Sequence, residues 1–540
     1  MDRAPLKPAL LATLALLFGG VLTAPAGAAL SAEALLEPTT VVVVDLQLPQ
    51  PSLEALEAEP DEYVQGTMAL YETDGTPAGI APDPVAPGPI TVGVRLKGST
   101  GSFQGLDGKA AFKVKFNEFV KGQKFLGLKK LTLNNMVQDA SMLHESLVYP
   151  AFRAAGIPAP HTGYAYVYVN GVDYGMHLNL ETMDDLALEK RFGEFDDPQH
   201  LYEGGPFFDV TAADLAKFEV DEGGEEELGD LEALIAAAAA DSPSFSSRIA
   251  PVADLDEMRR FWAAERYLGH WDGYSGLNVN NYYLYSDPEG VFQMLPWGTD
   301  QTLQLWSYPF TGNGGLLFDQ CLAEKACLAA YLEDLEAVAE STSALALTPR
   351  AEALAAQLAP WQAREIAESE RELFGASAIA AGVDQLLEFL DRRPGVLAKW
   401  LDSGEPPAEP DPEEEEPAVV APKREQPAPA DPPAVSTRLG LDRSQLGRGL
   451  LIARPAVSVA GTISLLAELG TPEGRRRACA AAPKQVGAGG AVLRCRLTDA
   501  VRGRLAKGPL GLQLTVSHQP PGGGPAHDVT RLVRLPRQAL

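Results

Sequence analysis

Residues 403–437 read SGEPPAEPDPEEEEPAVVAPKREQPAPADPPAVST, and this segment limits what the chain can fold into more than any other stretch. Its proline, glutamate and alanine content is typical of a solvated, semi-extended linker, because such a composition does not build a packed core. The chain of 540 residues is long enough for more than one domain. We therefore predict a linker at 403–437 between a large domain at 35–402 and a small module at 438–540.

Charge is distributed unevenly between the large domain and the small module. The net charge is −29, yet residues 438–540 hold 16 Lys and Arg against 5 Asp and Glu. The small module therefore carries +11 and the rest of the chain −40, which indicates two modules with different partners. The acidic part excludes a general nucleic-acid binder, because phosphate contacts need clustered cations. The basic module, with three arginines at 475–477, would suit an anionic cell-surface polymer or an acidic partner, and solubility alone is the alternative.

The first 28 residues are predicted to be a signal peptide. Arg3 and Lys7 give a basic start, residues 10–22 form a short apolar run, and an Ala-Gly-Ala sequence at 26–28 supplies the small residues of a cleavage site. A single membrane anchor is the alternative, although no later stretch reaches the ~20 apolar residues that a span requires. We therefore expect a protein that is secreted or at the cell surface, without a transmembrane span in the mature chain.

Four cysteines suit two disulfides in an exported chain. Proximity in the sequence predicts Cys321–Cys327 and Cys479–Cys495, although four cysteines allow three connectivities. A zinc site is the alternative, but the spacings do not match paired C-x₂-C knuckles.

Strand and helix signals predict an α+β large domain. TTVVVVDLQLPQ, ITVGVRLKG and KAAFKVKF read as strands, and GYAYVYVNGVDYGMHLNLE reads as a hairpin that turns at Asn170-Gly171. ASMLHESLVYPAFRAAG is an amphipathic helix closed by Gly156, and a helical region begins at Thr348-Pro349. After the linker, short alternating runs such as AVLRCRL and VTRLVRLPR, separated by Gly and Pro turns, predict a small all-β sandwich.

The stretch HWDGYSGLNVNNYYLYSDPEGVFQMLPWGTDQTL, at 270–303, holds the candidate chemistry. The runs NYYLY and VFQMLPW predict a strand pair that brings Asp272, Asn281 and Asp300 together. Asp272, among aromatic residues, is a candidate general base or acceptor-orienting group, and a helix cap is the alternative. Asn281 and Asp300 could complete a magnesium shell, since that ion takes a few oxygen ligands plus phosphates and water. Asn278 and Asn280 compete with Asn281, and their alternative is turn chemistry.

The chain resembles the CotH family, the spore-coat protein H-like atypical kinases, in an ordered series of motifs: VRLKGSTGSF, KAAFKVKF, LKKLTLNN, SMLHESLVYPAFRAAGIPAPHTGYAYVYVNGVDYGMHLNLETMD, LYEGG, HWDGY, NNYYLY and LPWGTDQTL. The resemblance covers about residues 40–400, and the ordered set is more specific than any single piece. It implies a divergent, two-lobed protein-kinase-like core in an exported protein. It also implies transfer of the ATP γ-phosphate, with Mg²⁺ or Mn²⁺, to Ser or Thr hydroxyls of a protein substrate.

Phosphoryl transfer consists mostly of positioning and charge neutralisation, which suggests roles for several residues. The apolar residues of KAAFKVKF share one strand face, so Lys113 and Lys115 share the other and are predicted to bind the nucleotide from a cleft, with a solvated strand face as the alternative. The turn at 98–101 is the candidate phosphate cover, and a polar hairpin tip is the alternative. The family has a glutamate at the position of Glu181, which is predicted to pair with a lysine. Glu145 is its rival, and a surface carboxylate is the alternative for either.

Two positions depart from the family pattern. The family commonly shows P-W-D-x-D, whereas this chain has Gly298 in place of the first aspartate and keeps Asp300. Glu203 stands in LYEGG where members often have lysine. A second hypothesis is therefore a catalytically inactive CotH-like module that binds a surface or coat partner. A third is a carbohydrate hydrolase that uses Asp272 and Asp300 as acid and base, because paired carboxylates also cleave glycosides.

Overall fold

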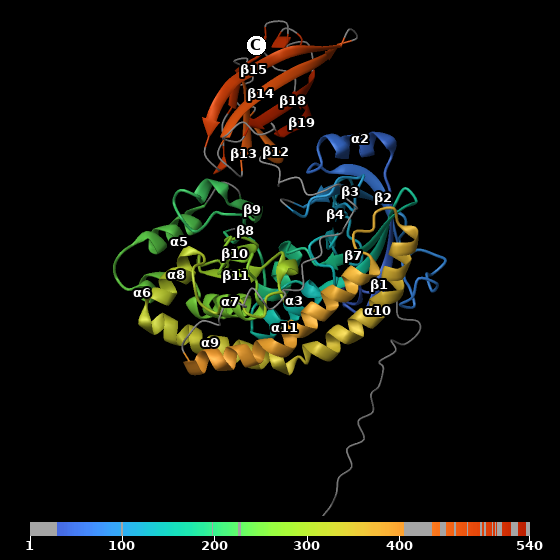
Figure 1. Ribbon diagram of the computed structural model, residues 1–540. Coiled ribbons are helices and arrows are strands. Elements are labelled where there is room, and N and C mark those ends of the chain that lie inside the picture. Colours follow the sequence, from blue (N-terminus) through green and yellow to red (C-terminus); the bar gives the residue numbers. More distant parts are fainter. Residues whose placement is uncertain are drawn as a thin grey trace, which may run out of the picture. The chain divides into compact units, whose positions relative to one another are not determined.

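The chain divides into two compact units, Met1–Pro422 and Lys423–Leu540, which are described separately here (Figure 1). The computed structural model describes residues 30–98, 101–196, 198–224 and 228–403, and beyond these the strands named below with residues 497–498, 501–502 and 504. The predicted signal peptide at 1–28 and nearly all of the predicted linker at 403–437 lie outside the described residues. The predicted domain boundaries therefore stay predictions.

A closed seven-stranded barrel forms one side of the first unit. Its strands follow the order β1-β2-β3-β4-β5-β7-β6, and every pair is antiparallel except β1 with β6. Their bounds are β1 (Val41–Gln47), β2 (Val64–Tyr71), β3 (Ile90–Lys97), β4 (Ala111–Lys115), β5 (Lys130–Asn134), β6 (Thr162–Val169) and β7 (Val172–Leu180). The parallel pair β1–β6 joins residues more than a hundred positions apart and closes the sheet. No local sequence pattern predicts this pairing.

Side-chain alternation decides which face of each strand enters the barrel. On β4, Phe112 and Val114 are buried in the barrel core, whereas Lys113 and Lys115 lie on the outer face, as the period-two pattern predicted. The predicted hairpin turn is also confirmed, since Val169 pairs with Val172 and the two residues between them both have positive φ. The barrel interior is therefore mostly apolar, with the buried His177 of β7 against Phe112, and the two lysines lie on its outer surface.

A second sheet and most of the helices form the rest of this unit. The sheet has the order β11-β10-β8-β9, with strands β8 (His200–Gly204), β9 (Glu219–Glu222), β10 (Tyr282–Ser286) and β11 (Phe292–Pro296). The predicted hairpin of NYYLY with VFQMLPW is the β10–β11 pair. Figure 1 shows the barrel on one side of the unit and this sheet on the other, with α3 between them.

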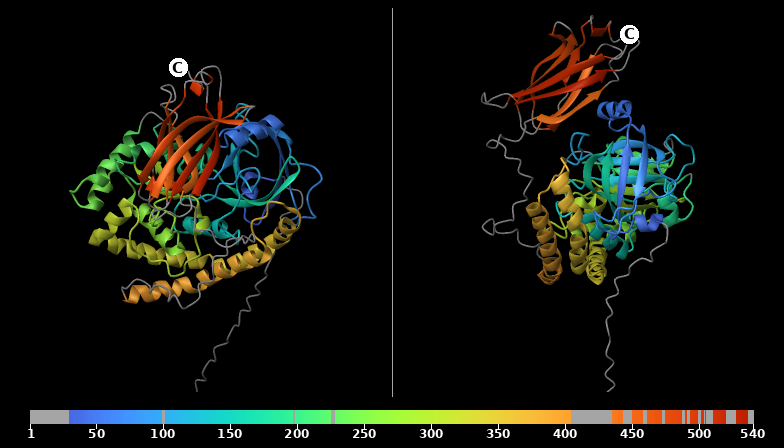
Figure 2. Two further views of the ribbon diagram at one scale, coloured as in Figure 1. Left: turned by 45° about the horizontal axis from the view of Figure 1, so that its top comes forward. Right: turned by 90° about the vertical axis from the view of Figure 1, so that its right-hand side faces the viewer.

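The helices from α3 onward pack into one core with the second sheet, whereas α1 and α2 bury Leu35 and Leu56 in the barrel core. Those before the β10–β11 hairpin are α1 (Ala32–Leu35), α2 (Gln50–Ala58), α3 (His144–Ala154), α4 (Asp185–Phe192), α5 (Gly229–Ala239), α6 (Phe245–Ile249) and α7 (Leu255–Leu268). Those after it are α8 (Leu316–Ala323), α9 (Lys325–Ala344), α10 (Leu347–Glu368) and α11 (Ala376–Ser403), with short 3₁₀ turns η1 (Leu215–Lys217) and η2 (Thr299–Gln301). Both views in Figure 2 show the long helices α9 to α11 gathered on one face of the unit. None of the helices in the described residues has the length and apolar run that a bilayer crossing needs.

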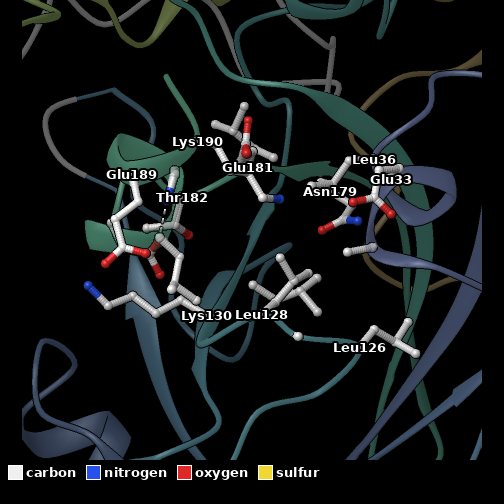
Figure 3. Close-up of a pocket in the computed structure, with 17 residues that line it drawn as sticks. Glu33, Leu36, Leu126, Leu128, Lys130, Asn179, Glu181, Thr182, Glu189 and Lys190 are labelled. Carbon is white, nitrogen blue, oxygen red and sulfur yellow. Dashed lines mark hydrogen bonds between the residues drawn. The ribbon is translucent and has the colours of Figure 1, made fainter. Parts of the chain in front are cut away.

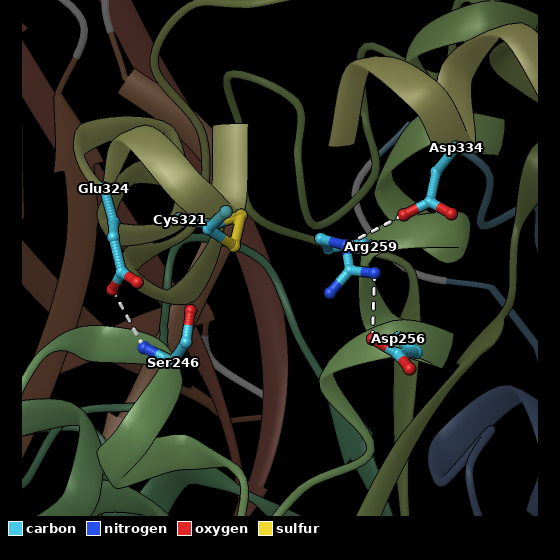
Figure 4. Close-up of a disulfide and its surroundings, with 7 residues drawn as sticks. Ser246, Asp256, Arg259, Cys321, Glu324 and Asp334 are labelled. Atoms are coloured by element: carbon cyan, nitrogen blue, oxygen red, sulfur yellow. Dashed lines mark hydrogen bonds and ion pairs between the residues drawn. A yellow bond between two sulfur atoms is a disulfide. The ribbon is translucent and has the colours of Figure 1, made fainter. Parts of the chain in front are cut away.

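Covalent and ionic ties hold these helices in place. The predicted disulfide Cys321–Cys327 joins α8 to the start of α9. Beside it, Arg259 of α7 pairs with Asp334 of α9 at 2.8 Å (Figure 4). A buried ion pair between Lys109 and Glu365 attaches α10 to the barrel. These ties therefore fix the helices relative to one another and to the barrel.

The second unit consists of two four-stranded antiparallel sheets in the described residues. One has the order β12-β13-β16 with β17 also on β13, and the other has the order β15-β14-β18-β19. The strands are β12 (Val435–Asp442), β13 (Leu450–Val457), β14 (Gly461–Thr471), β15 (Gly474–Val486), β16 (Gly489–Gly490), β17 (Leu493–Arg496), β18 (Leu510–Gln519) and β19 (His527–Leu535). The predicted disulfide Cys479–Cys495 connects β15 with β17 and so joins the two sheets. The mixed α+β class of the chain is confirmed, and the sandwich arrangement stays a prediction.

Candidate active site

The β10–β11 hairpin brings the ends of the HWDGY–PWGTD stretch together. Tyr282 opens β10 opposite Pro296, which closes β11, so the residues just outside this pair meet at one end of the hairpin. The backbone N–H of Trp297 donates to the carbonyl of Asn281 at 3.2 Å. Asn281 follows the Asp272 loop and Trp297 precedes Asp300. The strand pairing therefore places the Asp272 loop beside the turn that carries Asp300, as the sequence predicted.

Three amides hold the carboxylate of Asp272. Asn278 Nδ2 donates to its Oδ1 at 2.8 Å, and Asn281 Nδ2 and Asn280 Nδ2 donate to its Oδ2 at 2.9 and 3.3 Å. Hydrogen bonds to a carboxylate stabilise its charged form and fix its direction. The three asparagines thus do not compete for one role: all of them orient Asp272, which stays partly exposed.

Buried charges behind the loop fix its backbone. Glu265 of α7 accepts hydrogen bonds from the N–H groups of Tyr274 and Ser275 at 2.9 and 2.7 Å. Arg266, next along the helix, donates to the carbonyls of Ser275 and Asn313. Both side chains are buried, so these bonds are shielded from water. The backbone around Asp272 is therefore anchored on both sides by the end of one helix.

Asp300, which is half-buried, lies close to the buried carboxylate of Glu145. Burial and the charge of Glu145 raise the pKa of Asp300, and the charge of Lys97 opposes the shift. Burial likewise raises the pKa of Glu145, although Lys97 and hydrogen bonds from Tyr149 and Asn134 oppose it. The Asp300 backbone is tied to the same helix, because its carbonyl lies 2.7 Å from the Nδ1 of His144. Two carboxylates that repel one another in a buried space create a site for a cation.

Lys97, at the end of β3, is a cation whose charge acts on both of these acids, and it was not singled out in the sequence. Its charge lowers the pKa of Glu145, Asp300 and Glu203 against the effect of burial. Its ammonium group also lies 5.4 Å from the ring centroid of Trp297. The sequence signal was weak, because Lys97 is one of several lysines on alternating strands of the barrel.

The two lysines that were singled out lie further along the outer face. Lys113 is opposite Arg95 on β3, and its charge acts on Glu203. Lys115 is opposite Gly93 and pairs with Glu118 at 2.7 Å. Because Lys97 and Gly93 are four residues apart on one strand, Lys115 is roughly 13 Å from Lys97 along the sheet. The structure therefore brings Lys113 toward the acidic group formed by Glu145, Asp300 and Glu203, and it leaves Lys115 outside this group.

Glu181, the expected partner of a lysine, has a different partner. Its carboxylate pairs with Arg191 of α4 at 2.5 Å and accepts the N–H of His161 at 3.0 Å. Burial opposes ionisation, yet Arg191 outweighs it and lowers the pKa of Glu181. Glu181 lines a separate cavity of about 450 Å³ between α1, β5 and α4. Figure 3 shows it there together with Lys130 and Lys190. Its rival Glu145 is the glutamate that lies with Lys97 and Asp300.

The amide of Asn281 occupies the space that a side chain at position 298 would need. Gly298 has φ of 52°, and a Cβ added there would lie 2.5 Å from Oδ1 of Asn281. Since both Nδ2 bonds of Asn281 go to Asp272, this oxygen points into the space that a side chain at 298 would use. Gly298 is thus the residue that lets the Asn281 amide fit.

The donor atoms at this site suit a hard divalent cation. Among residues 30–403 that the structure describes, no three His, Cys, Asp or Glu side chains gather in an arrangement that could hold a metal by themselves. The available donors are the Asp300 carboxylate and the free oxygen of Asn281. Mg²⁺ commonly takes only one or two protein carboxylates and completes its shell with phosphates and water. Oxygen donors of this kind fit Mg²⁺ or Mn²⁺.

Comparison with known proteins gives two matches. A family model described as "CotH kinase protein" matches residues 94–397. The curated protein "Inner spore coat protein H" of Bacillus subtilis (strain 168) is 28% identical over 202 residues, which is 34% of this chain and 52% of that protein. The chain thus spans about half the length of this curated relative. The matched family region contains Lys97, Glu145, Asp272 and Asp300.

Proposed function

The chain belongs to the CotH family, and from this membership and the grouping of Lys97, Glu145, Asp272 and Asp300 we propose that it is an exported atypical protein kinase. It transfers the γ-phosphate of ATP to Ser or Thr hydroxyls of a protein. The barrel serves as one lobe and the β8–β11 sheet with its helices as the other. The observation that carries the proposal is that the β10–β11 hairpin brings the amide-held Asp272 beside Asp300, which lies with Glu145 where the charge of Lys97 acts on both acids.

Each side chain has a role in this reaction. Lys97 binds the phosphates from the barrel side, and Glu145 on α3 holds the lysine in place, as lysine–glutamate pairs do in phosphoryl transfer. Asp300 and the oxygen of Asn281 would hold Mg²⁺ or Mn²⁺, which neutralises phosphate charge when it is bound. Asp272 accepts the proton of the acceptor hydroxyl and keeps its oxygen in line with the phosphorus. The segment 98–101 follows Lys97 directly in the sequence and is proposed to cover the phosphates, although Ser99 and Thr100 lie outside the described residues.

Two further proposals concern the setting of this reaction. The name of the curated relative supports a location in a coat or at a surface, which agrees with the predicted signal peptide. The +11 charge of residues 438–540 supports binding of an anionic surface polymer by a sandwich-like second module. The kinase would then be held near its substrate by this module.

The test is transfer of labelled phosphate by the purified full chain with Mg²⁺ or Mn²⁺. Lys97→Met is expected to lower transfer by roughly 100-fold, in the range seen when one charge-stabilising donor is removed. Lys115→Met is the matched control, because it removes a lysine from the same barrel face outside the acidic group. Asp300→Ala should abolish metal-dependent nucleotide binding, whereas Asp272→Asn should keep binding and lose transfer. If the wild-type chain binds no nucleotide with any divalent ion, the inactive binding module is the correct function.

A further inference from the structure

Two exposed apolar side chains lie beside the Asp272 loop. Phe207 is 73% exposed and Leu277 is 71% exposed, the highest values for large apolar side chains among the described residues. The N–H of Phe207 lies 3.2 Å from the carbonyls of both Asn278 and Val279. Asn278, next to Leu277, donates in turn to the carboxylate of Asp272 at 2.8 Å. A chain of direct contacts thus connects both exposed side chains with the proposed base.

The segment that carries Phe207 is held in a strained conformation. Phe207 has φ of 64° and Val279, to which it bonds, has φ of 44°. Bulky and β-branched residues rarely adopt positive φ, and such strain persists only where the surroundings enforce it, commonly at functional sites. Here the enforced geometry leaves an aromatic ring in solvent, which does not contribute to folding.

Contacts with the core enforce this geometry. Asp209, two residues after Phe207, accepts hydrogen bonds from the hydroxyl of Tyr274 and the N–H of Leu316, at 3.0 and 2.6 Å. Gly205 is needed as well, because a Cβ there would lie 2.5 Å from the ring of Phe208. The loop is therefore a preorganised surface, and a ligand that binds it does not have to order it first.

We propose that Phe207 and Leu277 form a docking platform for the substrate polypeptide, and that the docked segment has an apolar side chain close to its acceptor hydroxyl. This inference rests on the proposed function and adds the class of acceptor. Asp272 contacts Asn281, the proposed metal ligand, on its nucleotide side, so the acceptor approaches from the side of Asn278 and passes the platform. Two apolar side chains from two separate segments offer more surface than one hydroxyl-bearing small molecule can cover, which favours a polypeptide.

The platform recognises a peptide by burying its apolar side chain, although the domain that carries the platform is acidic. The part of the chain before residue 438 carries −40, yet Phe207 and Leu277 bring no charge to the approach to Asp272. The nearest aromatic neighbour, Phe208, has the ammonium group of Lys217 at 5.9 Å, and this lysine is paired with Asp214. Burial of a peptide side chain against the platform would therefore contribute more to recognition than an ion pair there.

The first experiment measures peptide preference with the full chain. A peptide library with one central serine, and each flanking position varied, is phosphorylated with labelled ATP and Mn²⁺. We expect selection of Leu, Ile, Val or Phe at one or two flanking positions. Phe207→Ser and Leu277→Ser should each raise the KM for the preferred peptide about tenfold, while kcat and the KM for ATP stay unchanged. Phe119→Ser, a matched control at a 45% exposed phenylalanine of the β4–β5 connection, should change none of these.

A binding measurement separates failure of this inference from failure of the kinase function. Fluorescence anisotropy of labelled peptides needs no transfer, and the wild-type chain should bind a peptide with apolar flanks at least tenfold more tightly than one with serine flanks. Equal binding, or binding that survives both substitutions, would overturn the platform even if transfer occurs. Sedimentation of the wild type and both variants gives the other contrary result: if the substitutions dissociate a dimer, the surface joins two copies of this chain and is not a substrate site.

Discussion

The fit of Asn281 against Gly298 predicts a large and localised energetic coupling. In Gly298→Ala the new Cβ would lie 2.5 Å from Asn281 Oδ1, closer than folded structures allow, so the amide must move. Moving it breaks two hydrogen bonds from Nδ2 to Asp272, both 2.9 Å long. A typical bond contributes about 1 kcal/mol and one to a charged group up to about 3 kcal/mol, and the left-handed backbone costs about 1 kcal/mol more for a residue with a Cβ.

We therefore expect Gly298→Ala to lower the free energy of unfolding by about 3 kcal/mol. Asn281→Gly removes the obstructing amide, and glycine accepts the φ of 52° that Asn281 has. In that background Gly298→Ala should cost only the backbone contribution of about 1 kcal/mol. The remaining coupling is about 2 kcal/mol, well above the additivity that distant sites show.

Chemical denaturation of the four variants of this cycle, by circular dichroism, measures the coupling. Gly290→Ala is the matched control, because Gly290 in the β10–β11 turn also has positive φ but would meet its nearest atom only at 3.8 Å. It should cost about 1 kcal/mol in either background. If Gly298→Ala costs the same with and without Asn281, the amide does not occupy the space of the missing side chain, and the argument for the Asn281 oxygen as a ligand fails.

Three other outcomes can be measured on the same protein. Metal-dependent ATP binding should strengthen as pH rises from 5 to 8, because burial and mutual repulsion raise the pKa values of Asp300 and Glu145 and a metal needs Asp300 ionised. Asp300→Asn should lose binding together with most of this pH dependence. Binding that weakens as pH rises over this range would contradict the prediction. The sign for stability is opposite, since a carboxyl whose folded pKa is raised destabilises the fold as pH rises from its unfolded pKa to its folded pKa. Glu365→Ala should destabilise the first unit by roughly 3–5 kcal/mol in urea denaturation, because it leaves the buried ammonium of Lys109 unpaired, and a change below 1 kcal/mol would refute a structural role for this pair. Replacing the arginines at 475–477 with serine should weaken binding of the full chain to a polyanion such as teichoic acid and reduce its salt dependence, and unchanged binding in a pull-down would remove the proposed role of the basic module.

Several expectations from the sequence agree with the fold because they depend on neighbouring residues. Alternation in KAAFKVKF placed Phe112 in the core and Lys113 outside it, and Asn170-Gly171 specified a hairpin. The short separation of Cys321 and Cys327 was enough to predict their pairing. The encounter of the Asp272 loop with the turn of Asp300 followed from one hairpin between them.

Other parts of the site depend on contacts between distant segments. The barrel closes through β1 and β6, and only this closed sheet, packed against the second one, determines which end of its outer face meets α3. Lys97 and Lys113 have similar local sequence patterns, and the sequence offers both Glu145 and Glu181 as partners for a lysine. In the folded chain Glu181 forms an ion pair with Arg191, and Glu145 lies with Lys97 and Asp300.

The sequence by itself thus determined the strand faces, the hairpins, the disulfide partners and the family, because each is encoded in local periodicity, spacing or an ordered series of motifs. Only the tertiary structure decided which lysine meets the carboxylates, and that the amide of Asn281 fills the space left by Gly298. The physical reason is that a charge selects its partner by distance and burial in three dimensions. Both are set by packing between segments that are far apart in the chain.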